Sequence, residues 1–103
     1  MYRKIIGGGI GQGVRILCNG SSIEVRIEDI QKENRRATLK INRPTDIKET
    51  TLDYNREFEL DKYGLRISLW NRYGHGRKVN MHFDYPNQNY QFSLIPRVSS
   101  PVE

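Results

Sequence analysis

The sequence predicts an all-β protein, a small sandwich or barrel built from two similar antiparallel β units in one chain. Apolar and polar residues alternate with a period of two in four segments, as in strands that turn one face to a core and the other outward. No segment of ten or more residues carries an apolar stripe with the 3.6-residue period of a helix. Turn-forming residues separate the segments at intervals of about 8–12 residues, which is typical of sandwiches and barrels.

The first two alternating segments form one predicted hairpin. Its predicted core positions are Ile23, Val25, Ile27, Ala37, Leu39 and Ile41. A turn centred on Glu33 pairs Ile27 with Leu39, and the same register continues to the next apolar residues. This register also pairs Val25 with Ile41, so all the apolar side chains of the hairpin share one face.

The other two segments form a second hairpin of the same kind. Its predicted core positions are Leu65, Ile67, Leu69, Val79, Met81 and Phe83. A turn centred on His75 pairs Leu69 with Met81. The same register pairs Ile67 with Phe83. Because one hairpin cannot bury an apolar face by itself, we expect the two hairpins to face each other.

Shifting the chain along itself by 42 positions superimposes the two hairpins without a gap. Residues 16–52 then fall on residues 58–94. The shift also aligns Pro44 with Pro86 and superimposes two pairs of basic residues. Both prolines are expected to end a strand, because proline lacks the N–H donor of a sheet ladder. Since such coincidences are harder to obtain by chance than alternation, we interpret the pattern as an internal repeat.

The repeat divides the chain into four parts. Residues 1–13 supply an N-terminal edge strand and a glycine-rich segment, and residues 97–103 form a flexible tail. Residues 14–54 form the first β unit and residues 55–96 the second. The apolar faces of the units are expected to close against each other as a pseudo-dimer within one chain. A monomer is the expected assembly, and exchange of the N-terminal strand between copies is the alternative.

Length and composition limit the classes of protein to which the chain belongs. Of its 103 residues, 36% are hydrophobic and 10% aromatic, which supports a core and argues against disorder. No stretch approaches the roughly 20 apolar residues of a membrane span, and no signal-peptide pattern follows Met1. We therefore expect a soluble, cytoplasmic protein without a membrane partner. The formal charge of +5 favours an anionic partner.

Glycines dominate residues 7–13, in the order Gly-Gly-Gly-Ile-Gly-Gln-Gly. The segment matches neither of the common glycine-rich nucleotide-binding motifs, and a strand instead of a helix follows it. We therefore expect a flexible link or a turn in which two backbone segments approach closely.

No pattern of catalytic or metal-ligating residues stands out. The single cysteine, Cys18, excludes an internal disulfide, and it alternates with Ile16 as a small core residue. Neither His75 nor His82 has a second histidine or a cysteine at ligand spacing. His82 and Asp84 share a strand face, but no serine or threonine is placed to complete a hydrolytic triad. The sequence therefore predicts a non-enzymatic protein without a metal or other cofactor.

Residues 10–50 follow the pattern of a known family. The similar residues are Gly11-Gln12-Gly13-Val14-Arg15-Ile16, the strand Ile23-Glu24-Val25-Arg26-Ile27-Glu28-Asp29-Ile30, Asn34, and the run Ala37-Thr38-Leu39-Lys40-Ile41-Asn42-Arg43-Pro44-Thr45-Asp46-Ile47. This pattern resembles the carbon storage regulator family of bacterial RNA-binding proteins. The second unit looks like a more diverged copy, so the chain resembles a tandem duplication of the family.

The resemblance implies an intertwined β-sandwich of two five-stranded units, which two chains supply in the family and one chain would supply here. It also implies translational regulation through binding of mRNA at Gly-Gly-Ala loops. Family members contact RNA through an arginine in the first strand and another in the last. The matching places fall here in Gly7-Gly8-Gly9 and near Thr51 and Ser93, so neither arginine is present.

Basic and aromatic residues are the candidates for an RNA site. The basic candidates lie near the family's arginine positions, on the first hairpin or just after the two hairpin turns, and they are Arg3, Lys4, Arg35, Arg36, Lys40, Arg43, Lys48, Arg77 and Lys78. Of these, Lys40 and Arg43 are expected on the outward face of the first hairpin, with Arg26. Such residues contact phosphates without reading sequence. Trp70 and His82 fall on the outward side of the second unit, where they would stack on unpaired bases or contact a protein.

Two functions are open at this point. One is a non-enzymatic RNA-binding protein that resembles a translational regulator. The other is a protein-interaction or structural module, such as a small phage or mobile-element component, that kept the sandwich and lost RNA binding. The basic charge and the family pattern favour RNA binding. The missing arginines, and the acidic residues interleaved with the basic ones, favour the interaction module.

Overall fold

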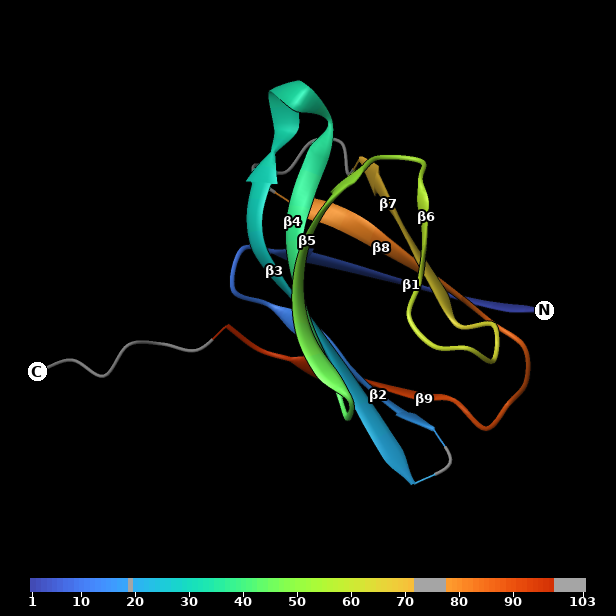
Figure 1. Ribbon diagram of the computed structural model, residues 1–103. Coiled ribbons are helices and arrows are strands. Elements are labelled where there is room, and N and C mark those ends of the chain that lie inside the picture. The colour runs from blue at the N-terminus through green and yellow to red at the C-terminus, as the bar shows by residue number, and fades with distance from the viewer. Residues whose placement is uncertain (19, 72–77, 98–103) are drawn as a thin grey trace, which may run out of the picture.

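Two antiparallel β-sheets make up the computed structural model, which describes residues 1–18, 20–71 and 78–97 (Figure 1). Sheet A has the strand order β1-β8-β7-β6, and sheet B has the order β5-β4-β3-β2-β9. The strands are β1 (Tyr2–Gly9), β2 (Gly13–Cys18), β3 (Ser21–Gln31), β4 (Arg36–Arg43), β5 (Asp46–Asp53), β6 (Glu57–Glu59), β7 (Arg66–Asn71), β8 (Lys78–Tyr85) and β9 (Gln91–Ile95). The predicted fold class, a small all-β sandwich, is confirmed.

The two predicted hairpins lie in opposite sheets and pack against each other. β3 and β4 pair in the predicted register, with Val25 opposite Ile41. β7 and β8 also pair as predicted, with Ile67 opposite Phe83. All four of these side chains are fully buried and belong to one core between the sheets. Hydrophobic burial between the two hairpins therefore holds the sandwich together.

The strands of the two units correspond along the chain. Shifting β4 by 42 positions gives the bounds of β8, and the same shift carries β3 over β7 and β5 over β9. Pro44 and Pro86 follow directly after β4 and β8 and end them, as predicted. The strands β3, β4 and β5 of the first unit thus occur in the same order as β7, β8 and β9 of the second.

The end strands pair differently in the two units. β5 returns along β4 of its own unit, because the two residues Pro44 and Thr45 suffice to reverse the chain. β9 follows a longer link from β8 and crosses to sheet B, where it pairs with β2. β1 pairs with β8 and takes the place in sheet A that β5 takes in sheet B. In Figure 1 β1 and β8 run across the direction of β4 and β5. Strands from both ends of the chain therefore tie the two sheets together.

The glycine-rich segment carries the chain from sheet A to sheet B. Residues 7–9 belong to β1, and the turn that follows places Gly11 at φ +89°, a left-handed conformation that suits glycine. A Cβ atom at Gly13 would overlap the carbonyl oxygen of Val25, so the backbones of β2 and β3 approach there too closely for a side chain. The expected turn with close backbone approach is confirmed.

A β-bulge in β3 keeps both parts of this long strand against the core. The register with β4 shifts between Ile27 and Asp29, so strict alternation fails there. Ile27 and Ile30 are both buried as a result. A 3-10 turn (Lys32–Asn34) then reverses the chain, and Arg35 follows it with φ +53°. Within the described ranges, we find no helix with the length and apolar character needed to cross a bilayer.

Candidate nucleic-acid interface

An exposed tryptophan lies on the outer face of sheet A. Trp70 points away from the core because it follows the buried Leu69 in the alternation of β7. It is 39% exposed, and its ring stacks on His82 of β8 with the centroids 5.3 Å apart and the planes 28° apart. The indole N–H donates a hydrogen bond of 3.1 Å to Ser68 Oγ. The structure therefore brings the two predicted aromatic contacts, Trp70 and His82, into one stack.

The environment of His82 favours the uncharged form of its imidazole. Desolvation lowers its pKa, the positive charge of Arg3 lowers it further, and Asp84 acts in the opposite direction. Its Nδ1 atom is buried and has no hydrogen-bond partner among the described residues. The ring beneath the indole is therefore an uncharged stacking partner.

The neighbours of the stack leave it open on one side. Ile5 of β1 lies opposite His82 and is 55% exposed. Asn80 of β8 lies opposite Trp70, and on its other side it faces Gly7 of β1. Because glycine has no side chain, nothing on β1 covers Asn80 from that side. We call Ile5, Gly7, Trp70, Asn80 and His82 the aromatic platform.

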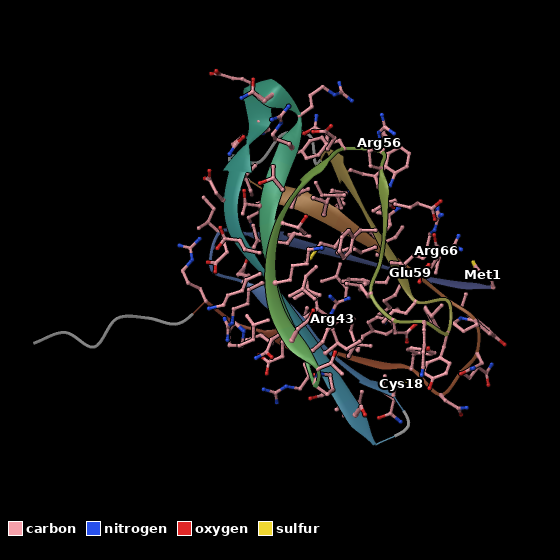
Figure 2. The ribbon with its side chains drawn as sticks, viewed as in Figure 1. Met1, Cys18, Arg43, Arg56, Glu59 and Arg66 are labelled. Atoms are coloured by element: carbon pink, nitrogen blue, oxygen red, sulfur yellow. The ribbon has the colours of Figure 1, made fainter. Side chains whose placement is uncertain are left out.

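Ion pairs occupy the opposite end of the same face. Arg3 Nε and Nη2 donate to the two carboxylate oxygens of Asp84 at 2.7 and 3.2 Å. This hydrogen bonding lowers the pKa of Asp84 from its ordinary value. Arg66 lies opposite Asp84 and Glu59, and its Nη1 is 3.9 Å from a carboxylate oxygen of Glu57. Figure 2 shows Arg66 and Glu59 near each other beside β6 and β7. Arg3, a predicted RNA contact, is thus held by a protein carboxylate.

The remaining basic candidates of sheet A lie at its margins. Lys78 begins β8 opposite Gly9, on the same outer face as Asn80 and His82. Lys4 lies opposite the core residue Phe83, so it belongs to the inner side of β1, where it is exposed at the sheet edge. Only Lys78 therefore adjoins the aromatic platform. Arg77 falls outside the described residues.

The outer face of sheet B carries charged residues of both signs. Lys40 lies between Arg26 of β3 and Glu49 of β5. Two ion pairs flank this row, Arg15 with Glu24 at 3.1 Å and Arg36 with Asp53 at 3.3 Å. Arg26 and Lys40 are neighbours of like charge, and the acidic residues Glu24, Glu49 and Asp53 on the same face confine this positive group to a small area.

Arg43 does not project from the outer face of sheet B, and the prediction that it would is wrong. It lies two residues beyond the buried Ile41 and therefore shares the inner side of β4. Its guanidinium donates to both oxygens of Asp46 at 2.7 and 2.9 Å and to the Leu60 carbonyl oxygen at 3.5 Å. The hydrogen bonds from Arg43 hold the pKa of Asp46 below its ordinary value. Arg43 is thus a structural ion-pair partner.

Two further candidates serve packing. Lys48 lies opposite Ile41, on the inner side of β5, and its ammonium sits 5.4 Å from the centroid of the Phe58 ring. Arg35 caps the turn between β3 and β4, and its carbonyl oxygen accepts a hydrogen bond from the Tyr54 N–H at 2.8 Å. The described basic candidates are consequently spread over both sides of both sheets and do not form one patch.

A hollow of about 530 Å³ is lined by residues that include Arg43 and Cys18, both labelled in Figure 2. Its polar centre is Asp61, which the sequence patterns did not indicate as a site residue. Asp61 accepts hydrogen bonds from the backbone N–H groups of Tyr63 and Leu65 at 2.9 Å each and from the Tyr90 hydroxyl at 2.7 Å. The run Asp-Lys-Tyr-Gly at residues 61–64 is the turn signal from which the backbone contacts follow.

These contacts make the hollow a structural feature. Burial raises the pKa of Tyr90, and its hydrogen bond to Asp61 raises it further. Cys18 is half-buried and packs against the core, as predicted for a small core residue. Two charged side chains of the lining, Arg43 and Asp61, are thus engaged by hydrogen bonds within the protein.

Neither a metal-binding cluster among the described residues nor a similar known protein indicates a function. No three His, Cys, Asp or Glu side chains of the described residues lie close enough together to hold a metal ion. Comparisons of the chain with protein families, curated proteins and solved structures found no match. The aromatic platform is therefore the feature of the described surface whose chemistry best fits recognition of a partner.

Proposed function

We propose that this protein binds single-stranded RNA on the outer face of sheet A, with an unpaired base stacked on Trp70. The observation that carries the proposal is the aromatic platform, in which a partly exposed indole rests on a neutral imidazole. β-Sheet proteins that bind single strands place bases on aromatic rings in this way, and every base offers a face for stacking.

Three neighbours of the stack supply further contacts in the proposed complex. The Asn80 amide, next to the indole, offers a donor and an acceptor to a base edge. The exposed side chain of Ile5 extends the apolar surface beside His82. Lys78 makes no ion pair with any described residue and lies on the same face, where it would contact a phosphate.

The resemblance to the carbon storage regulator family supports RNA as the nucleic acid. The exchange of β1 and β9 between the two sheets is the kind of intertwining that this resemblance implies. The family's arginine positions are not basic here, so the proposed contact surface is a different one. In this proposal the chain acts as a non-enzymatic regulator that holds an RNA segment, without any catalytic group.

The ion pairs of Arg3, Arg36 and Arg43 leave few cations for phosphate contacts. The proposed binding therefore depends on stacking more than on charge. With two or three phosphates neutralised, the slope of log affinity against log salt is expected between about −1.4 and −2.1, since single strands contribute about −0.7 per contact. A much steeper slope would indicate binding through a basic surface instead.

Fluorescence tests the proposal directly, because Trp70 is the only tryptophan of the chain. Titration with an unstructured RNA oligonucleotide of about 12 nucleotides is expected to quench its emission. Anisotropy of a labelled oligonucleotide then measures affinity for variants. Trp70→Ala is expected to weaken binding by about 5- to 100-fold, the loss of one stacked base. Lys40→Ala on the outer face of sheet B is the control and should bind normally. Binding that is absent, or equally strong in Trp70→Ala, contradicts the proposal.

Protein interaction is the second candidate function, and one observation favours it. Three of the predicted RNA contacts, Arg3, Arg36 and Arg43, are engaged by aspartates of the same chain. Under this alternative the aromatic platform would be buried against another protein, because exposed aromatic groups are frequent anchors of interfaces. RNA binding that is undetectable at micromolar protein and low salt, with the variant proteins folded, supports the alternative.

A further inference from the structure

The two sheets end in four edge strands, β1 and β6 in sheet A and β5 and β9 in sheet B. Alternate residues of an edge strand leave their N–H and C=O groups unpaired, so an edge accepts another strand unless something protects it. Charged side chains, proline, bulges and short length are the usual protections. The four edges of this protein differ in this respect.

Three of the edges are protected. β1 carries Arg3 and Lys4, and β6 is only three residues long and contains Glu57 and Glu59. β5 carries four charged residues in eight positions. Approach of a second copy of the chain to β1 would bring like charges together, which opposes pairing.

β9 differs from the other edges. Its sequence, Gln-Phe-Ser-Leu-Ile at residues 91–95, contains no charged residue, although 28% of the whole chain is charged. Leu94 is 70% exposed, and Phe92 and Ile95 are only half-buried. On the neighbouring strand β2, Leu17 is also exposed, opposite Gln91. β9 therefore combines unpaired backbone with an apolar, uncharged surface.

We propose that β9 is a self-association edge, through which two copies of the chain join their five-stranded sheets in antiparallel fashion. A two-fold axis at Ser93 uses all five residues of the strand. It sets Phe92 of one copy opposite Leu94 of the other, twice, and Ser93 opposite Ser93. The Phe92–Leu94 pairs are apolar, Gln91 lies opposite Ile95 at each end, and no like charges come together among the five residues.

The contact is small. Pro96 follows β9 directly and limits the ladder to five residues on each copy. Such an interface falls below the about 1,200 Å² of standard protein–protein contacts, so the dimer is weak and forms in the range of tens to hundreds of micromolar. Since β9 lies in sheet B and the aromatic platform lies in sheet A, dimer formation does not depend on RNA binding.

Sedimentation velocity of the full chain between about 10 µM and 1 mM tests the dimer. The wild-type mass is expected to rise from 12.1 kDa towards twice that value. Leu94→Lys should remain monomeric over the whole concentration range, because each lysine would then lie opposite the apolar Phe92 of the other copy. Ile47→Lys is the matched control, since Ile47 is 66% exposed on β5, the opposite edge of the same sheet. This control should dimerise as the wild type does.

A cross-link tests the proposed axis. In a Cys18→Ser background, Ser93→Cys is expected to form a disulfide-linked dimer on mild oxidation, because opposed residues of antiparallel strands lie within disulfide range. Ile47→Cys is expected to give no such dimer. A wild type that stays monomeric to 1 mM overturns the proposal, and so does a dimer that survives Leu94→Lys, which would point to exchange of β1. Circular dichroism checks that Leu94→Lys folds; if it does not, the Ser93→Cys cross-link decides alone.

Discussion

The two sheets present different surfaces to solvent, although their inner faces are alike. Sheet A has a stacked tryptophan and histidine on its outer face, whereas the outer face of sheet B carries charged residues of both signs, including two ion pairs. The repeat makes the contrast direct, because the 42-residue shift places Trp70 on Glu28 and His82 on Lys40. Both stacked rings of the second unit thus replace charged residues of the first.

The difference teaches where function is expected in a sandwich whose two hairpins share one core. Inner positions such as Val25 and its repeat counterpart Ile67 must fill one shared core, so packing keeps them apolar. Outer positions contact no such core and are free to diverge. The side that carries the exposed aromatic stack is therefore the side on which we place the binding function.

The largest expected effect concerns the shared core. Phe83 and Ile41 are counterparts under the 42-residue shift. Phe83→Ala should lower the free energy of unfolding by about 3–5 kcal/mol and Ile41→Ala by about 2–5 kcal/mol, because each removes buried apolar surface and leaves a cavity in the core. Urea denaturation measures both values. Comparable losses would support an equal contribution of the two units to the core. A loss below about 1 kcal/mol in only one of the two variants would show that the units contribute unequally.

The second prediction separates the outer faces. Trp70→Ala is expected to cost about 1–3 kcal/mol of RNA-binding free energy, and its repeat counterpart Glu28→Ala is expected to cost none. Anisotropy titrations at one salt concentration give both values. Trp70→Phe keeps an aromatic ring and should retain most of the affinity. If Glu28→Ala weakens binding as much as Trp70→Ala, the two faces do not differ in the way proposed.

A smaller effect is expected at the turn of the first hairpin. Arg35 adopts a left-handed φ of +53°, which disfavours a side chain with a Cβ atom. Arg35→Gly should therefore raise the free energy of unfolding by about 0.5–1 kcal/mol, measured by urea denaturation. The same variant removes a cation from the first unit, and its RNA affinity should equal that of the wild type. Reduced affinity would place part of the RNA contact on this hairpin.

The smallest expected effect is a pH dependence from the second unit. Burial lowers the pKa of His82 in the folded protein, so the unfolded chain binds a proton more readily. Stability from this group is complete above its ordinary pKa of 6.5 and declines as the pH falls below that value. Thermal unfolding at pH 7.5 and 5.5 measures the decline, which should be smaller in His82→Gln. An equal decline in both proteins would assign the pH dependence to other groups.

Alternation, together with the positions of the turns, was enough to predict the two hairpins, their register and the part of the core that they supply. Val25 and Phe83 lie as expected because a period of two leaves a buried strand face no other choice. The partner of an end strand is not set by its own alternation. β9 crosses to β2 because β1 already occupies the free side of β8, and this depends on the whole topology.

The candidate site was predicted only in part, for similar reasons. Trp70 and His82 were assigned to the outward side from strand alternation, but their stacking depends on how β7 aligns with β8. The pairing of Arg3 with Asp84 joins residues 81 positions apart and leaves no local signal. The alternation of β4 itself places Arg43 on the inner side, two residues after Ile41, so the prediction of an outward Arg43 did not follow that alternation to the end of the strand. Ion pairs with aspartates of the same chain therefore engage three of the basic residues predicted for the RNA site, Arg3, Arg36 and Arg43.

Chemical-shift mapping by NMR tests the central claim most directly. Addition of an unstructured RNA oligonucleotide to ¹⁵N-labelled protein should shift the amide signals of Ile5, Gly7, Asn80 and His82 and the indole N–H signal of Trp70. Signals from the outer face of sheet B, such as that of Lys40, should stay in place. Shifts that concentrate on sheet B, or no shifts at saturating RNA, would contradict the assignment of binding to the aromatic platform.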